Sequence, residues 1–156
     1  MKLLRWIALT LVLTSCVAFA QTPGRILTPT RFVTIFSNLE NQLTDALVAN
    51  ASASAARLVT EDFSQWTPQP PGSPVPREEW LKSAGRGLAN FRIRQMSAKD
   101  LGDHVAVSFV LTTGAKAFFI VDIWQKAGTD WQLATRYLSP VDPAPFRGDI
   151  RPTGKN

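Results

Sequence analysis

The chain has 156 residues, of which 45% are hydrophobic and 19% charged, and its formal net charge is +5 at pH 7. That length suits one domain with a sizeable core and excludes two full-sized ones, and the composition is that of an ordinary globular protein. The sequence shows no long basic run, no zinc-ligand spacing and no aromatic-basic RNA motif. We therefore expect no nucleic-acid partner, and no motif calls for a metal ion or a cofactor.

The chain opens with the pattern of a secretory signal peptide over residues 1–20. Lys2 and Arg5 form a basic start, residues 6–13 form an apolar run, and residues 18–20 read Ala-Phe-Ala, a small-x-small cleavage site. The apolar run is too short for a permanent membrane span. The sequence therefore predicts a periplasmic or secreted protein that has lost residues 1–20 and has no membrane span.

The same segment holds a second export pattern. Residues 13–16 read "LTSC" and resemble the lipobox of bacterial lipoproteins, in which case Cys16 would be lipidated and would anchor the protein. Residues 17–20 are apolar and end in Ala-x-Ala rather than in a polar tether, which favours ordinary cleavage. Cys16 is the only cysteine, so a chain cleaved after residue 20 has no disulfide and no thiol chemistry.

Two helices are predicted at the start of the mature chain. Residues 21–29 hold two prolines and should form a loose approach, and the folded domain should span residues 30–141. Helical periodicity predicts a long helix over 31–49, with Asn50 as its stop. A short helix should begin at Ser52. The apolar positions of the long helix are Phe32, Ile35, Phe36, Leu39, Leu43, Ala46 and Leu47, and we expect Phe32, Phe36, Leu39 and Leu43 to face a sheet.

A proline-rich stretch separates the helices from the rest. Residues 61–66 should be extended, and the prolines of 67–76 predict a surface loop. Pro76 suits the first turn of a third helix. Glu78 and Glu79 would then lie near the N-terminus of that helix, where the helix dipole stabilises carboxylates. A basic cluster near this helix could attract an anion, although such a cluster beside two glutamates is more typical of a solvated face. Its members are Arg77, Lys82, Arg86, Arg92 and Arg94.

The second half of the domain should consist of strands. Alternating and apolar runs linked by tight turns predict four of them, over 90–101, 104–113, 116–126 and 130–139. Helices followed by hairpin-linked strands indicate an α+β fold in which helices cover one face of an antiparallel sheet. Residues 142–156 are proline-rich and polar, and should form a flexible tail.

This order of elements resembles the nuclear transport factor 2-like superfamily, and in particular its small bacterial SnoaL-like and ketosteroid-isomerase-like branch. The resemblance rests on "VTEDFSQW" (59–66), "PREEWL" (76–81) and "VDIWQKAGTDWQLATRYLS" (121–139), and it spans about residues 30–141. It implies a cone, in which a strongly curved antiparallel sheet wraps around about three N-terminal helices and leaves a pocket. It also implies a homodimer through the outer face of the sheet.

One carboxylate stands in the middle of an apolar strand. Asp122 interrupts residues 118–124, and a carboxylate in such a place is costly unless it is paired. The resemblance implies that Asp122 and Trp124 point into the cone, together with Ala134, Arg136 and Leu138 of the last strand. Inward residues of neighbouring strands meet, so Asp122 and Arg136 should pair. A paired carboxylate stays ionised, and Arg136 could then bind the carboxylate or phosphate of a ligand.

The same resemblance gives Asp122 a second possible role. In ketosteroid-isomerase-like members the matching acid donates a hydrogen bond to a substrate oxygen. The general base of those enzymes would fall near Thr67, which cannot serve. The single histidine, His104, starts a strand beside a turn, where exposure is more common than catalysis. The sequence therefore identifies no catalytic residue.

Three functions remain open at this level. The first is an exported, non-catalytic protein that binds a small amphipathic or anionic molecule, and the lack of a general base favours it. The second is a SnoaL-like or isomerase-like enzyme that uses Asp122. The third is a structural or partner-binding dimer whose cone is filled by side chains, and the volume of the pocket distinguishes it from the others. The candidate ligand-binding residues are Asp122, Trp124, Arg136, Leu138, Trp66 and Trp80.

Overall fold

The computed structural model describes residues 29–68 and 74–144. The predicted leader and nearly all of the predicted tail lie outside these residues. The elements are α1 (Pro29–Val48), α2 (Ser52–Arg57), β1 (Val59–Trp66), β2 (Val75–Pro76), α3 (Arg77–Ser83), β3 (Arg92–Asp100), β4 (His104–Thr113), β5 (Lys116–Ala127) and β6 (Asp130–Val141). No helix within the described residues is long and apolar enough to cross a membrane.

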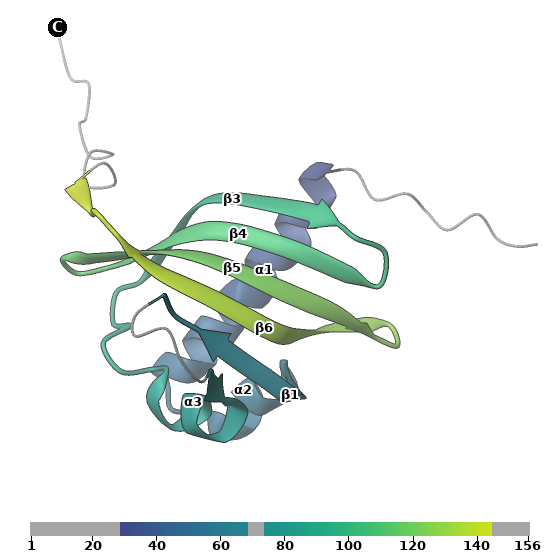
Figure 1. Ribbon diagram of the computed structural model, residues 1–156, viewed down its shortest axis with the longest axis horizontal. Helices are drawn as coiled ribbons and strands as arrows, with labels where there is room; N and C mark the ends of the chain where they lie inside the picture. Colours follow the sequence, from purple (N-terminus) through teal and green to yellow (C-terminus); the bar gives the residue numbers. More distant parts are fainter. Residues whose placement is uncertain (1–28, 69–73, 145–156) are drawn as a thin grey trace, which may run out of the picture.

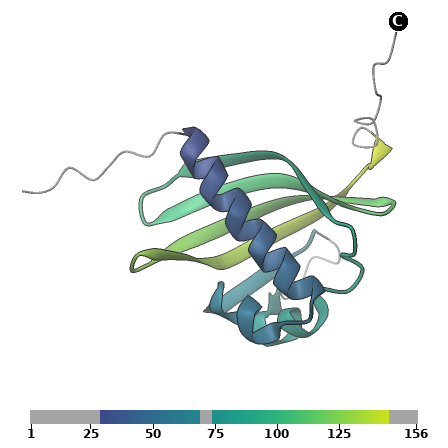
Figure 2. The ribbon, with the colours of Figure 1, turned by 180° about the vertical axis from the view of Figure 1, so that it is seen from behind.

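The strands form one open sheet in the order β2-β1-β6-β5-β4-β3. The last four strands are an antiparallel meander, as predicted. The expectation of a wholly antiparallel sheet is wrong at β1, which pairs with β6 in parallel. Figure 1 shows α1 behind the sheet, and Figure 2, from behind, shows it crossing the strands obliquely. The fold is therefore α+β, with a six-stranded mixed sheet and the helices on one side.

The buried face of α1 differs by one position from the prediction. Phe36 and Leu43 are fully buried as expected, whereas Leu39 is only partly buried. The position in the centre of the face is held by Glu40, whose exposed fraction is 0%. Residues three and four apart share a helix face, so Glu40 lies in line with Phe36 and Leu43. The helix therefore carries a carboxylate into the core.

Local signals explain where the helices begin and end. Asn50 has a φ of 53°, the left-handed conformation that stops α1, and asparagine tolerates it better than most residues. Pro76 caps α3, where its missing N–H costs nothing. Gly85, after α3, lies against α1: a Cβ there would stand 2.1 Å from the carbonyl oxygen of Leu47. The two helices can approach this closely only because residue 85 has no side chain.

A β-bulge in β6 reverses which residues of that strand face the core. Ile123 lies opposite Thr135, but Trp124 lies opposite Leu133, so Ala134 is an extra residue without a partner on β5. A bulge inserts one residue and shifts the alternation beyond it. The expectation that Ala134 points inward is therefore wrong, and Leu133, with 0% exposure, takes the core position.

Candidate functional site

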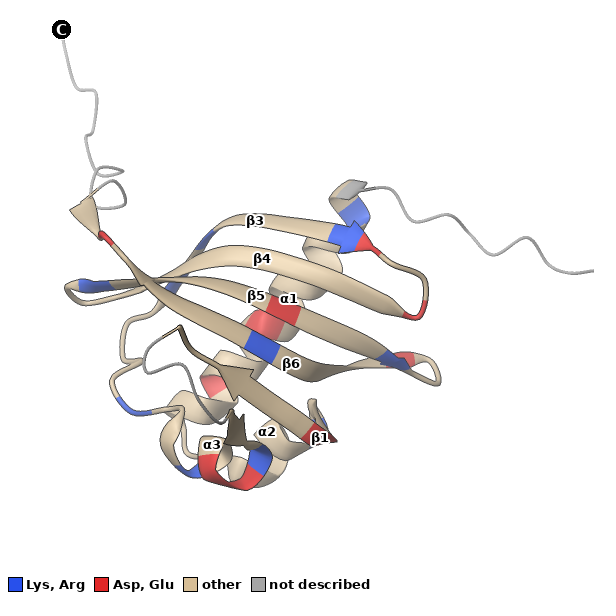
Figure 3. Cartoon of the chain, viewed as in Figure 1, with Lys and Arg blue, Asp and Glu red and all other residues tan. Residues whose placement is uncertain are grey.

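Three charged side chains meet inside the domain. Arg136 donates from Nε to Asp122 Oδ1 at 2.9 Å and to Oδ2 at 3.1 Å, and from Nη2 to Oδ2 at 2.5 Å. The same Nη2 donates to Glu40 Oε2 at 2.9 Å, and Trp124 Nε1 donates to Glu40 Oε1 at 2.8 Å. Figure 3 shows the three charges together at the middle of the sheet, on β5, β6 and the helix behind them. We call Glu40, Asp122 and Arg136 the charge cluster.

The fold explains why these residues meet. Asp122 and Arg136 are direct partners in the register of β5 and β6, so their side chains leave the sheet on the same face. The sequence therefore predicted this pair correctly. Glu40 comes from α1, which covers that face. All three are removed from water, with exposed fractions of 0% for Glu40 and Asp122 and 4% for Arg136.

The cluster shifts the pKa of two of its members. Burial raises the pKa of Glu40 well above its ordinary value, and the charge of Asp122 adds to the rise, while Arg136 and Trp124 oppose it without cancelling it. Burial by itself would lower the pKa of Arg136, but Asp122 and then Glu40 raise it on balance. The guanidinium is therefore charged at every working pH, and Glu40 is the group of the cluster that favours a bound proton.

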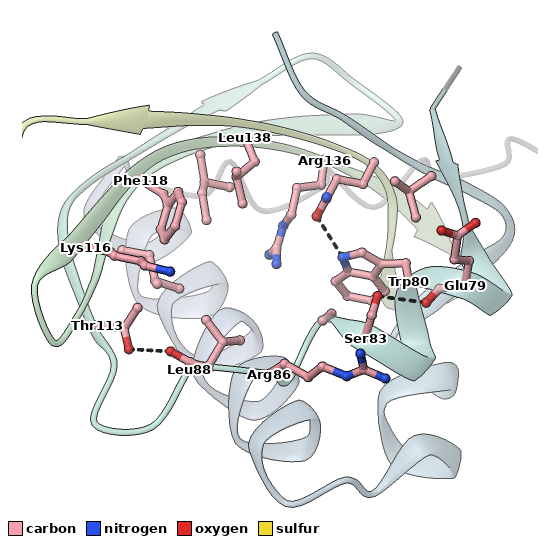
Figure 4. A pocket seen from close by; sticks show the side chains of 16 residues that line it. Glu79, Trp80, Ser83, Arg86, Leu88, Thr113, Lys116, Phe118, Arg136 and Leu138 are labelled. Carbon is pink, nitrogen blue, oxygen red and sulfur yellow. Dashed lines mark hydrogen bonds between the residues drawn. The ribbon is translucent and has the colours of Figure 1, made fainter. Parts of the chain in front are cut away.

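A cavity of about 320 Å³ opens beside the cluster. Its apolar wall comes mainly from the sheet, and its opposite side comes from α3 and the segment that follows. Figure 4 shows the Arg136 side chain entering the cavity from the strand side, near Trp80. The apolar wall includes Leu111, Phe118, Ile120 and Leu138.

Arg136 belongs to both the cluster and the cavity. Its Cζ lies 5.6 Å from the ring centroid of Trp80, and the indole of Trp80 is itself fixed by donating to Gln65 Oε1 at 2.8 Å. Within residues 29–68 and 74–144, Nε and Nη2 have carboxylate partners, whereas Nη1 has no protein acceptor. A guanidinium has five N–H donors, so this one keeps donors to spare.

The exposed edge of the cavity is polar and mainly basic. Arg86 and Lys116 line it from two sides, and both are exposed. Neither has an ion-pair partner among the described residues. Among the described residues that line the cavity, Glu79, also exposed, is the only carboxylate. We call Arg86, Lys116 and Glu79 the rim.

The six predicted ligand-binding residues fall in three places. Trp80, Arg136 and Leu138 line the cavity. Asp122 and Trp124 point to the same side of the sheet but are fully buried and do not line it. Trp66 lies elsewhere: it is 40% exposed and stacks on Tyr137, their ring centroids 6.5 Å apart, beside a smaller hollow. The structure thus joins Asp122 to Arg136 and Trp124 to Glu40, and leaves Trp66 apart.

Sequence reasoning missed Glu40, the central acid of the cluster. A signal for it was present, because position 40 lies four residues after Phe36 and three before Leu43, both predicted to face the sheet. A charged residue within such a stripe is rare unless it has a partner. The position of Glu40 in this stripe could therefore have predicted a buried carboxylate that is paired with a cation.

Comparison with known proteins places the architecture. No protein-family model and no curated protein matches the chain. Among solved structures, an NTF2-like protein from Cytophaga hutchinsonii matches with 18% identity over 69% of this chain and 97% of its own, at a TM-score of 0.52. The chain has the nuclear transport factor 2-like fold.

Two further structures of this fold carry names that suggest an activity. A candidate dehydratase of the NTF2-like family from Streptomyces avermitilis is 16% identical over 73% of this chain and 99% of its own, with a TM-score of 0.57. A candidate ketosteroid isomerase from Parabacteroides distasonis is 14% identical over 70% and 87%, with a TM-score of 0.53. Such identities establish a common fold, and one fold hosts many functions. The function of this chain depends on its own side chains.

Proposed function

We propose that the chain is an exported protein that binds a small, largely apolar molecule in the cavity beside the charge cluster without transforming it. The position of Arg136 carries this proposal. Buried carboxylates hold two of its nitrogens, Nη1 has no protein acceptor among the described residues, and the side chain reaches into the cavity. An arginine held this firmly, with donors to spare, suits an oxygen of a bound molecule. The apolar wall suits the rest of it.

Binding without catalysis is supported by where the acids lie. A general acid or base must come within hydrogen-bond reach of the reacting atom. Both oxygens of Asp122 accept from Arg136, and Asp122 does not line the cavity. Glu79, the one carboxylate among the described lining residues, is exposed at the rim. We call the end of the cavity formed by Arg136 the deep end. Within the part of the chain that the structure describes, the isomerase-like alternative has no acid there.

The size of the cavity favours a ligand over a filled cone. A volume of about 320 Å³ has room for roughly ten water-sized groups of about 30 Å³ each. It falls at the lower end of the range for sites that bind small molecules. A molecule with about ten non-hydrogen atoms is therefore the scale of ligand to seek.

The proposal includes a homodimer through the outer face of the sheet, the face turned to the reader in Figure 1. Phe119 lies opposite Val110, Val121 lies opposite Tyr137, and Tyr137 lies opposite Trp66, so these five share that face. Phe119 is 42% exposed and Tyr137 is 49% exposed. An apolar, aromatic face of this kind suits a two-fold contact with a second copy.

Native mass spectrometry of protein made with its own leader and purified from the periplasm tests the proposal. We expect a chain that begins at Gln21 and retains a small molecule. Ala84 lines the cavity, so Ala84→Leu places a larger side chain inside it and should abolish retention. Ala53→Leu makes the same change at an exposed position of α2 and should leave retention unchanged.

Each part of the proposal can fail separately. A diacylglyceryl adduct on Cys16 would contradict a soluble exported form. A folded wild-type protein that carries no molecule, or equal retention in both leucine variants, would contradict binding in this cavity.

A further inference from the structure

The deep end of the cavity carries no net positive charge, although an arginine forms it. The single charge of Arg136 faces two carboxylates, Asp122 and Glu40, each within hydrogen-bond distance and each 0% exposed. With one proton shared between the carboxylates the cluster is neutral, and with none it is negative. Burial and the proximity of Asp122 raise the pKa of Glu40, which favours the neutral state. Arg136 therefore offers donors to the cavity without excess positive charge.

This charge balance determines which group can bind Arg136. A carboxylate placed against Nη1 would be the third acid around one guanidinium, and it would lose its water on entering. A buried anion is costly unless a cation is left to neutralise it. An uncharged oxygen, as in a ketone or a hydroxyl group, accepts the same hydrogen bond without that cost. The deep end therefore selects a neutral acceptor over an anion.

The rim has the opposite preference. Arg86 and Lys116 are exposed and unpaired among the described residues, and together they exceed the one nearby acid, Glu79. An anion bound beside one of these cations keeps part of its hydration, so its attraction to that cation is not offset by full desolvation. Figure 4 shows Lys116 and Arg86 at separate edges of the cavity, with Phe118 and Leu138 between Lys116 and Arg136.

We propose that the ligand is an amphipathic keto or hydroxy acid that enters with its uncharged oxygen first. Its neutral oxygen accepts from Arg136, its apolar body lies along Phe118 and Leu138, and its carboxylate stays at the rim beside Lys116. This inference rests on the proposed binding function and adds the class and the orientation of the ligand to it.

Matched seven-carbon probes test the orientation by calorimetric titration of the intact mature protein. They are a keto acid with its ketone next to the terminal methyl, heptanoic acid, and heptanedioic acid. The keto acid should bind best. Heptanoic acid should bind about tenfold more weakly, because it lacks one hydrogen bond to a charged donor. Heptanedioic acid, with an anion at both ends, should bind no better than heptanoic acid.

A rim variant tests the other end of the ligand. Lys116→Gln should weaken the keto acid several-fold and leave methyl pentyl ketone, which has no carboxylate, unchanged. Lys99→Gln, at an exposed position of β3 that does not line the cavity, should change neither. Tighter binding of heptanedioic acid than of the keto acid would overturn the orientation while leaving the binding function intact. Failure of the keto acid to bind would overturn the ligand class, and retention of a native molecule then decides the binding function separately.

Discussion

Trp124 and Glu40 are joined by a hydrogen bond of 2.8 Å between Nε1 and Oε1, although they stand 84 positions apart in the chain. With the Arg136 bond to the other oxygen of Glu40, it ties the middle of α1 to both central strands. Each polar atom in this link is buried, so each lost partner leaves another without a substitute from water. The charge cluster should therefore contribute to the stability of the fold, as well as setting the charge at the deep end of the cavity.

Arg136→Met should destabilise the protein by about 3–5 kcal/mol. The substitution keeps much of the volume of the side chain but leaves two buried carboxylates without their cation, which is the costly way to break a buried ion pair. The free energy of unfolding in urea measures the loss. Arg92→Met, at an exposed position of β3, is the matched control and should stay within about 0.5 kcal/mol of wild type.

A second substitution separates the pair from other effects of Arg136. Asp122→Asn combined with Arg136→Met should be more stable than Arg136→Met alone, because the neutral amide no longer leaves a buried charge. Glu40 can hold its proton in that background. Strict additivity of the two single changes would show that Asp122 and Arg136 do not act as a pair.

Glu40 should make the folded protein lose stability as pH rises above 4.5. Burial first, and Asp122 second, raise the pKa of Glu40 in the folded chain above its ordinary value of 4.5. Between those two pKa values the folded state holds a proton that the unfolded state has released, so the free energy of unfolding falls with pH. The slope is about 1.4 kcal/mol per pH unit for one proton. Below 4.5 both states hold the proton and the contribution is complete.

Glu40→Gln isolates this contribution, because an amide does not ionise. The advantage of wild type over Glu40→Gln in urea unfolding should be largest at and below pH 4.5 and should shrink at higher pH. Glu61→Gln, at an exposed position of β1, is the control for a general effect of removing a carboxylate. Parallel stability curves for wild type and Glu40→Gln would contradict a raised pKa.

Periodicity and register explain why some of this could be predicted from sequence. Alternation in two adjacent strands, with the family resemblance to select the inward parity, was enough to pair Asp122 with Arg136. It failed at Ala134, because a bulge changes the parity and leaves no mark in the pattern of residues. The parallel pairing of β1 with β6 also could not be predicted from the pattern of residues. It depends on where tertiary packing places β1 against the sheet.

Burial of Glu40 could not be inferred from its own residue type. A glutamate on a helix is usually exposed, and its burial here depends on Arg136 and Trp124, which follow it by a large part of the chain. Helical spacing shows which face position 40 occupies, but only the partners make that face acceptable for a carboxylate. Leu39 shows the opposite case. It is apolar and was predicted to face the sheet, but it lies beside the buried face of α1 and is only partly buried.

Gly85→Ala should destabilise the contact between α1 and the end of α3. A methyl group at residue 85 would stand 2.1 Å from the backbone oxygen of Leu47, a distance no contact tolerates, so one helix must move. Overpacking of this kind typically costs about 1–3 kcal/mol. Thermal unfolding measures it, with Ser83→Ala at an exposed position of α3 as the control. Equal melting temperatures for Gly85→Ala and wild type would show that the two helices are free to separate.

The proposed homodimer predicts that Phe119→Lys is a monomer. Phe119 is 42% exposed on the outer face of β5, and a second copy packed on that face would have to bury the new charge without a partner. Leu101→Lys is the matched control, since Leu101 is 51% exposed in the turn between β3 and β4, away from that face. Light scattering coupled to size-exclusion chromatography should give half the wild-type mass for Phe119→Lys and the full mass for Leu101→Lys. A monomeric wild type, or an unchanged dimer in Phe119→Lys, would exclude this face as the contact. The cavity lies on the opposite side of the sheet, so the monomer should still bind the keto acid.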